Sequence, residues 1–88
     1  MQKTQTHTMT SEVREVVSRA LTGYGARLEG DRIAYDEATT DIRIGVRRGR
    51  LLFEATSYDT THVLARGPIS EETVAGVVDF YLVLPKTN

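Results

Sequence analysis

The sequence has no cysteine, only two lysines and no long apolar run. Without cysteine the chain can form no disulfide, no thiolate nucleophile and no thiolate metal site, so packing or a partner must stabilise it. No segment approaches the roughly 18 apolar residues that a membrane-spanning helix needs, and the opening residues MQKTQTHTMT lack the apolar core of a secretory signal. These absences predict a cytoplasmic protein with no membrane partner.

Motifs for catalysis and cofactor binding are also missing. The chain has no glycine-rich phosphate loop and no nucleophile elbow. His62 follows Tyr58 and Asp59, and a carboxylate could orient its imidazole for acid–base chemistry. An exposed strand histidine is the simpler explanation, because the other histidine, His7, lies in the polar N-terminal segment. One histidine with scattered carboxylates also lacks the spacing of metal ligands, so we expect no catalysis, no metal and no cofactor.

The first nine residues are polar and rich in threonine, with no apolar periodicity. We predict a disordered leader over residues 1–9 and a single domain over residues 10–88. A domain of this length buries only about 60–65% of the surface that its unfolded chain exposes, so its core should be thin.

Residues from Thr10 onward show the spacing of an amphipathic helix. Apolar residues recur at i, i+3, i+4, i+7, i+8 and i+11, at Val13, Val16, Val17, Ala20, Leu21 and Tyr24. Thr10 or Ser11 can cap the exposed amides of the first turn, and Gly23 and Gly25 can adopt the left-handed conformations that end a helix. The sequence therefore predicts an N-terminal helix.

The middle of the chain alternates apolar and polar residues, as antiparallel strands with one solvated face do. Gly30 and Asp31 suit a two-residue hairpin turn, and Gly49 can turn the chain between two further runs. In those two runs Ile42, Ile44, Val46, Leu51, Phe53 and Ala55 fall on one face, opposite Asp41, Arg43, Arg47, Leu52, Glu54 and Thr56. Further alternation from Thr61 to Arg66 brings the prediction to four or five strands in a meander.

A second helix is predicted after the GPIS segment. Ser70 can cap this helix, and Ile69 can pack against Val74 in a hydrophobic staple. The FYLVL run near its end is either helix or strand, because β-branched and aromatic residues also suit a strand, and Pro85 ends the run in both cases. The order of elements predicts an α+β fold, an antiparallel meander flanked by an N-terminal and a C-terminal helix.

The C-terminal run carries more large apolar side chains than one face of a short helix can bury against a thin sheet. Exposed apolar surface of this kind marks association. Two interpretations are open: a helix buried between the sheet and the first helix, or a surface for a partner or a homodimer. The association surface would consist of Val77, Phe80, Tyr81 and Leu84.

Four arginines fall within eight positions, at Arg43, Arg47, Arg48 and Arg50, although the net charge of the chain is only −1. This cluster straddles a predicted hairpin tip. It could form cross-strand pairs with Glu54 on a solvated face, contact the phosphates of a nucleic acid, or recognise another protein. Nearby carboxylates and the lack of a stacking aromatic on the solvated face weigh against nucleic acid.

Three segments carry a resemblance at the level of pattern: VVSRALTGYGARLEGDRIAYDE, RGRLLFEA and THVLARGPISEETVAGVVDFYL. Over about residues 13–84 their order resembles the small actinobacterial immunity proteins related to the immunity factor of the tuberculosis necrotizing toxin. Members of that group run from a leading helix through β-hairpins to a terminal helix with an apolar-aromatic end. The resemblance implies a cytoplasmic protein that binds a cognate toxin tightly, blocks its active site and has no catalytic activity of its own.

The residues themselves fit inhibition by binding, because a small rigid sheet with mixed charge and no catalytic set can cover an enzyme. We therefore predict a non-catalytic protein-binding domain. The alternatives are a nucleic-acid-binding protein and a dimeric regulatory or chaperone-like protein. The predicted partner-binding residues are Arg43, Arg47, Arg48, Arg50, Glu54, Tyr58, Asp59 and His62.

Overall fold

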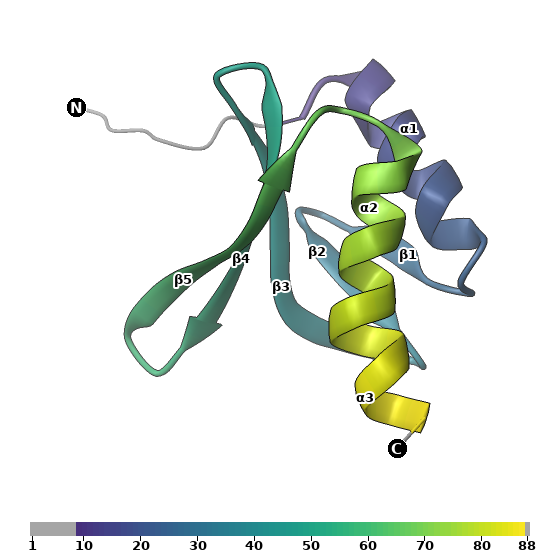
Figure 1. The fold of residues 1–88 in the computed structure, drawn as a ribbon, viewed down its shortest axis with the longest axis vertical. Helices are drawn as coiled ribbons and strands as arrows, with labels where there is room; N and C mark the ends of the chain where they lie inside the picture. Colours follow the sequence, from purple (N-terminus) through teal and green to yellow (C-terminus); the bar gives the residue numbers. More distant parts are fainter. Residues whose placement is uncertain (1–8, 88) are drawn as a thin grey trace.

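In the computed structural model, which describes residues 9–87, the chain forms an N-terminal helix, then a five-stranded antiparallel sheet, then a C-terminal helical segment (Figure 1). The elements are α1 (Ser11–Thr22), β1 (Arg27–Glu29), β2 (Arg32–Tyr35), β3 (Ala38–Arg47), β4 (Arg50–Ser57), β5 (Thr60–Gly67), α2 (Glu71–Val78), the π-helical turn η1 (Asp79–Val83) and α3 (Leu84–Thr87). The predicted α+β meander is confirmed, with five strands.

The strands follow one another in the sheet in chain order, from β1 at one edge to β5 at the other. Both helical segments cover the same face of this sheet (Figure 1). The core lies between these layers, where Val17 and Leu21 of α1 and Val78 of α2 are buried with Ile33 and Phe53 of the sheet. None of the helices in residues 9–87 lies on the opposite face, which we call the outer face (Figure 1).

Residues 1–8, on which most of the predicted leader falls, lie outside the described residues. Met9, which the sequence assigned to the leader, is buried in the core cluster. It directly precedes Thr10, whose side chain accepts a hydrogen bond of 3.3 Å from the Val13 amide and caps α1. Met9 is therefore part of the packed domain.

The end of α1 differs from the prediction at one glycine. Gly25 has φ +73° and is left-handed, but Gly23 has φ −62° and continues the helical turn. The amide of Ala26 bonds the carbonyl of Leu21, and the amide of Gly25 bonds that of Thr22. This pair of bonds is a Schellman motif, which needs one left-handed residue, so the prediction for Gly23 was wrong.

Two-residue turns set the register of the meander. Gly30 has φ +64° in the predicted hairpin between β1 and β2, and Arg48 and Gly49 have φ +55° and +76° between β3 and β4. Asp36 and Glu37 also take positive φ between β2 and β3, at a position where the sequence has no glycine. Tight turns of this kind set the register of the strands beside them, and β-bulges shift it further along, between Arg32 and Ala34 and between Phe53 and Glu54.

The C-terminal segment is helical throughout, which settles the ambiguity of the FYLVL run. Ser70 caps α2 as predicted, by accepting a hydrogen bond of 3.3 Å from the amide of Thr73. A π-helical turn at Asp79–Val83 then follows α2 without a break. Tyr81 projects from this turn and donates its hydroxyl proton to the carbonyl of Leu64 on β5, at 3.2 Å.

Candidate functional site

The outer face of β3, β4 and β5 is built from cross-strand rows. The register places Arg47 opposite Arg50, and two residues further along it places Gly45, Leu52 and Arg66 in one row. Cross-strand partners share a face, so these side chains lie together on the side of the sheet that has no helix. Gly45 contributes no side chain to its row.

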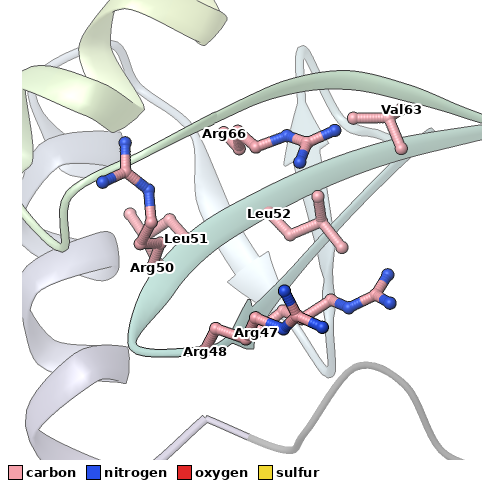
Figure 2. A pocket seen from close by; sticks show the side chains of 7 residues that line it. All are labelled: Arg47, Arg48, Arg50, Leu51, Leu52, Val63 and Arg66. Atoms are coloured by element: carbon pink, nitrogen blue, oxygen red, sulfur yellow. The ribbon is translucent and has the colours of Figure 1, made fainter.

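A pocket of about 210 Å³ opens on this face (Figure 2). We call it the arginine pocket, and it is lined by Arg47, Arg48, Arg50, Leu51, Leu52, Val63 and Arg66. Figure 2 shows the side chain of Leu52 between that of Arg66 on one side and those of Arg47 and Arg48 on the other. The pocket thus has an apolar floor and a rim of guanidinium groups.

Leu52 is only 5% exposed although no helix covers its face of the sheet. The neighbouring side chains in the pocket are arginines and Val63. Arginine can bury its aliphatic stem along apolar surface while its guanidinium group stays in water. The arginine stems and Val63 lie beside Leu52 on this face, and their burial of its side chain accounts for its low exposure.

No carboxylate is among the lining residues of the pocket. Within the described part of the chain, the arginine ion pairs are those of Arg19, Arg27 and Arg43, and none involves a pocket arginine. Glu54, the nearest acidic position on the same face of β4, stands between Arg43 and the pocket residue Val63, so it borders the pocket without lining it. The pocket is consequently a local concentration of positive charge in a chain whose net charge is −1.

Arg43 already has an acidic partner within the domain. Its strand register opposite Glu54 is as expected, but its guanidinium group binds Asp31 in the β1–β2 turn, with the Nη2 atom 3.0 Å from Oδ2. Asp31 directly precedes β2, and its main-chain carbonyl also accepts a hydrogen bond of 2.7 Å from the Ile44 amide. Arg43 therefore belongs to an ion pair and does not line the arginine pocket.

Arg66 is the pocket residue that the sequence missed. Strict alternation along β5 would put it on the face of His62, which is the helix side of the sheet. The register with β4 shifts by one residue between Phe53 and Glu54, so that Ala65 pairs with Phe53 and Val63 pairs with Glu54. This β-bulge turns Arg66 to the outer face, opposite Leu52.

The remaining predicted site residues lie at the other end of β4. Tyr58 and Asp59 form the β4–β5 turn, which Figure 1 shows away from both helices, and Tyr58 is 99% exposed. β4 has eight residues, which corresponds to about 23 Å at about 3.3 Å per residue. His62 is exposed but pairs with Ala55 and faces the helix side. The structure therefore does not bring all the predicted residues into one surface.

A second hollow lies on the helix side of β5, between that strand and the C-terminal helical segment. It has a volume of about 440 Å³, and we call it the β5 groove. Its apolar lining includes Leu64, Ala65, Val77, Phe80 and Tyr81. Phe80 is 62% exposed, and its ring meets that of Tyr81 edge to face at 4.9 Å.

The four residues of the predicted association surface differ in exposure. Val77 is 5% exposed and belongs to the core cluster, so it offers little surface to a partner. Tyr81 is half-buried, while Phe80 and Leu84 are the two exposed members. The helical spacing of the run explains this split, because a segment packed on the sheet turns some of its apolar residues inward and others outward.

The rest of the described chain offers little that points to chemistry. Among residues 9–87, no three histidine, aspartate or glutamate side chains come together as a group that could hold a metal ion. No helix in that range is long and apolar enough to span a membrane.

Comparison with known proteins adds no relative: no protein-family model, no curated protein and no solved structure matches this chain.

Proposed function

We propose that this chain is a non-catalytic domain that binds an acidic region of another protein through the arginine pocket. One observation carries the proposal: four guanidinium groups surround a buried leucine, and no carboxylate lines the pocket with them. Like charges held together repel one another, and an anionic partner relieves that repulsion.

The size of the pocket fits a side chain rather than a whole small molecule. Ligand sites for drug-sized molecules have volumes of about 300–1,000 Å³, whereas the arginine pocket has about 210 Å³. Guanidinium groups bind carboxylates through paired hydrogen bonds with fixed geometry. A glutamate or aspartate side chain on a protein surface can place its carboxylate at the rim and its methylene groups over Leu52.

The resemblance described above suggests which partner to test first. It implies a cognate toxin in the cytoplasm, whose active site this domain would cover. Charged rims steer such partners together and raise the rate of encounter, and a few desolvated arginines supply most of the affinity. In this form of the proposal, the arginine pocket is the anchor of an immunity protein.

Nucleic-acid binding is the second candidate, and the same observation favours it. A rim of four arginines could neutralise phosphates as well as carboxylates. The residues that line the pocket include no aromatic side chain, and binders of single strands use such side chains to stack bases. The pocket is also a compact hollow rather than a groove that could follow a backbone, so we place protein binding first.

Capture from native lysate with charge-reversal baits tests the proposal. The baits are the wild-type chain, the double variant Arg47→Glu/Arg48→Glu and the control Arg27→Glu, with mass spectrometry and nucleic-acid staining of whatever is retained. Arg27 is a matched control because it is an exposed strand arginine of the same sheet that is already paired with Glu29. We expect one stoichiometric protein on the wild-type and Arg27→Glu baits and none on the double variant.

Two results would contradict the proposal. Equal retention of the same protein by the double variant would show that the arginine pocket does not bind it. Retention of nucleic acid alone, with loss at high salt, would assign the arginines to phosphate binding.

A further inference from the structure

β5 is a long edge strand of the sheet. It has eight residues and pairs with β4, and no other described strand lies on its far side. The opposite edge, β1, has three residues. Edge strands present unpaired main-chain groups, and proteins protect them by making them short or by covering them. β1 meets the first condition. β5 is longer, and although it has a β-bulge and its Leu64 carbonyl already accepts from Tyr81, the rest of its edge offers a template for an added strand.

The two faces beside this edge differ in chemistry. On the helix side lies the β5 groove, which is mostly apolar and includes one carboxylate, that of Glu72. In this groove Phe80 is mostly exposed and Tyr81 is held by its bond to the Leu64 carbonyl. On the outer side lies the arginine pocket. Arg66 lines both hollows, so they meet at the same stretch of β5.

A strand added at this edge would point alternate side chains to the two faces, because successive side chains of a strand lie on opposite sides. We propose that β5 and the β5 groove bind an extended segment of the protein partner in which apolar and acidic residues alternate. The apolar side chains enter the groove against Phe80, and the acidic side chains face Arg66 and the arginine pocket. This inference rests on the proposed function and specifies the form of the partner.

Charge complementarity favours a segment of another protein over residues 1–8 of this chain and over the β5 strand of a second copy. Residues 1–8 of the chain itself contain no acidic residue and one apolar residue, Met1, so they do not have the required alternation. A second copy that paired its own β5 here would present the sequence TTHVLARG, which contains no carboxylate for Arg66. The complementary segment must therefore come from another protein.

Binding of a synthetic probe to the full chain tests the inference. The probe is a fluorescein-labelled peptide of about eight residues in which valine and glutamate alternate, a length that matches β5 at about 3.3 Å per residue. The control peptide has the same composition, with the valines in one block and the glutamates in another. We expect saturable binding of the alternating peptide, measured by fluorescence anisotropy, and at least tenfold weaker binding of the blocked peptide.

Two variants locate the site on the protein. Phe80→Asp should lower the affinity for the alternating peptide at least tenfold, because this change removes the exposed apolar wall of the β5 groove. Leu84→Asp is the matched control, since Leu84 is half-exposed, lies in the same helical segment and does not line the groove. Circular dichroism confirms that both variants fold, and Leu84→Asp should change the affinity less than threefold.

The outcomes separate this inference from the proposed function. Absence of saturable binding, equal binding of the blocked peptide, or equal effects of Phe80→Asp and Leu84→Asp would overturn the inference. Any of these results leaves the proposed function standing if the captured protein still depends on Arg47 and Arg48. A concentration-dependent dimer that Phe80→Asp dissociates would also overturn it and assign the β5 edge to a second copy.

Discussion

Tyr58 combines almost complete exposure with an unfavourable backbone conformation. Its side chain is 99% exposed, and its φ of +58° lies in the left-handed region. For residues other than glycine and asparagine this region costs roughly 1–2 kcal/mol. A strained and exposed aromatic residue at a hairpin tip gives the isolated domain little stability.

Replacing Tyr58 should therefore stabilise the domain. We expect Tyr58→Asn to raise the free energy of unfolding by about 1 kcal/mol, because asparagine tolerates the left-handed conformation and no buried contact is lost. Urea unfolding measures this as a higher midpoint with an unchanged slope. Tyr58→Phe keeps the strain and should leave the midpoint where it is. A loss of stability in Tyr58→Asn would show that the tyrosine ring packs on the sheet.

Leu52 is the second residue whose environment makes a direct prediction. Leu52→Ala should lower the free energy of unfolding by about 2 kcal/mol, because the arginine stems over it can only partly close the cavity. Thermal or urea unfolding measures this loss. Val63→Thr is the control on the same face, since Val63 is 48% exposed and the change keeps its branched shape. If the two variants lose equal stability, the pocket floor is not packed by arginine stems.

At the scale of elements, the close approach of β5 and α2 depends on one glycine. A Cβ atom added at Gly67 would lie 3.1 Å from the Cγ2 atom and 3.2 Å from the Oγ1 atom of Thr73. Gly67 is buried and pairs with Leu51, so neither the strand nor the helix can easily move away. The glycine therefore fixes the spacing between the sheet and the start of α2.

A larger residue at this position should loosen that contact. We expect Gly67→Val to destabilise the domain by about 2 kcal/mol through overpacking. Adding Thr73→Ala to the same chain should recover part of the loss, because it removes both atoms that the new side chain meets. Unfolding of the two single variants and the double variant forms the test. Additive losses would mean that Thr73 is not the obstacle.

Elements that depend on local residues were predictable from the sequence. The Thr10 and Ser70 caps, the Gly30 turn and the turn at Gly49 all follow from side chains within three or four positions, and each is present. The helical ending of the FYLVL run was not predictable, because tertiary packing on the sheet decided between two conformations that its residues both allow. The prediction that Gly23 is left-handed was wrong. The Schellman motif at the end of α1 needs one left-handed residue, and the sequence offered two glycines for that position.

The candidate site was only partly predictable for a similar reason. The sequence shows the clustering of Arg47, Arg48 and Arg50, because these residues lie within four positions around one turn. Arg66 lies beside them because of the β-bulge in β5. No residue in that strand is of a type that predicts a β-bulge. Arg43 does not line the pocket and instead binds Asp31, a partner that only the fold of the β1–β2 turn brings within reach.

Over the whole molecule, acidic and basic groups are unevenly paired. Arg19 binds Glu15 and Glu71 at 3.2 and 3.3 Å and links α1 to α2, and Arg43 binds Asp31. These exposed pairs contribute little stability individually. The paired arginines are spread over the molecule. Among the described residues, six arginines have no ion pair, and four of these six line the arginine pocket, whereas Arg14 and Arg32 lie elsewhere. The near-neutral total charge therefore conceals a localised positive site, which is the feature that the proposed function uses.

An alanine scan of the affinity for the captured protein tests this account most directly. Calorimetric titration would compare the wild-type chain with single alanine variants of Arg27, Arg43, Arg47, Arg48, Arg50 and Arg66. Protein interfaces concentrate their energy in a few residues, so we predict losses of about thirtyfold at one or two pocket arginines. Changes at Arg27 and Arg43 should stay below about threefold, since both are already paired on the free domain. Equal losses at all six positions, or none at any pocket arginine, would contradict the claim that the arginine pocket recognises the partner.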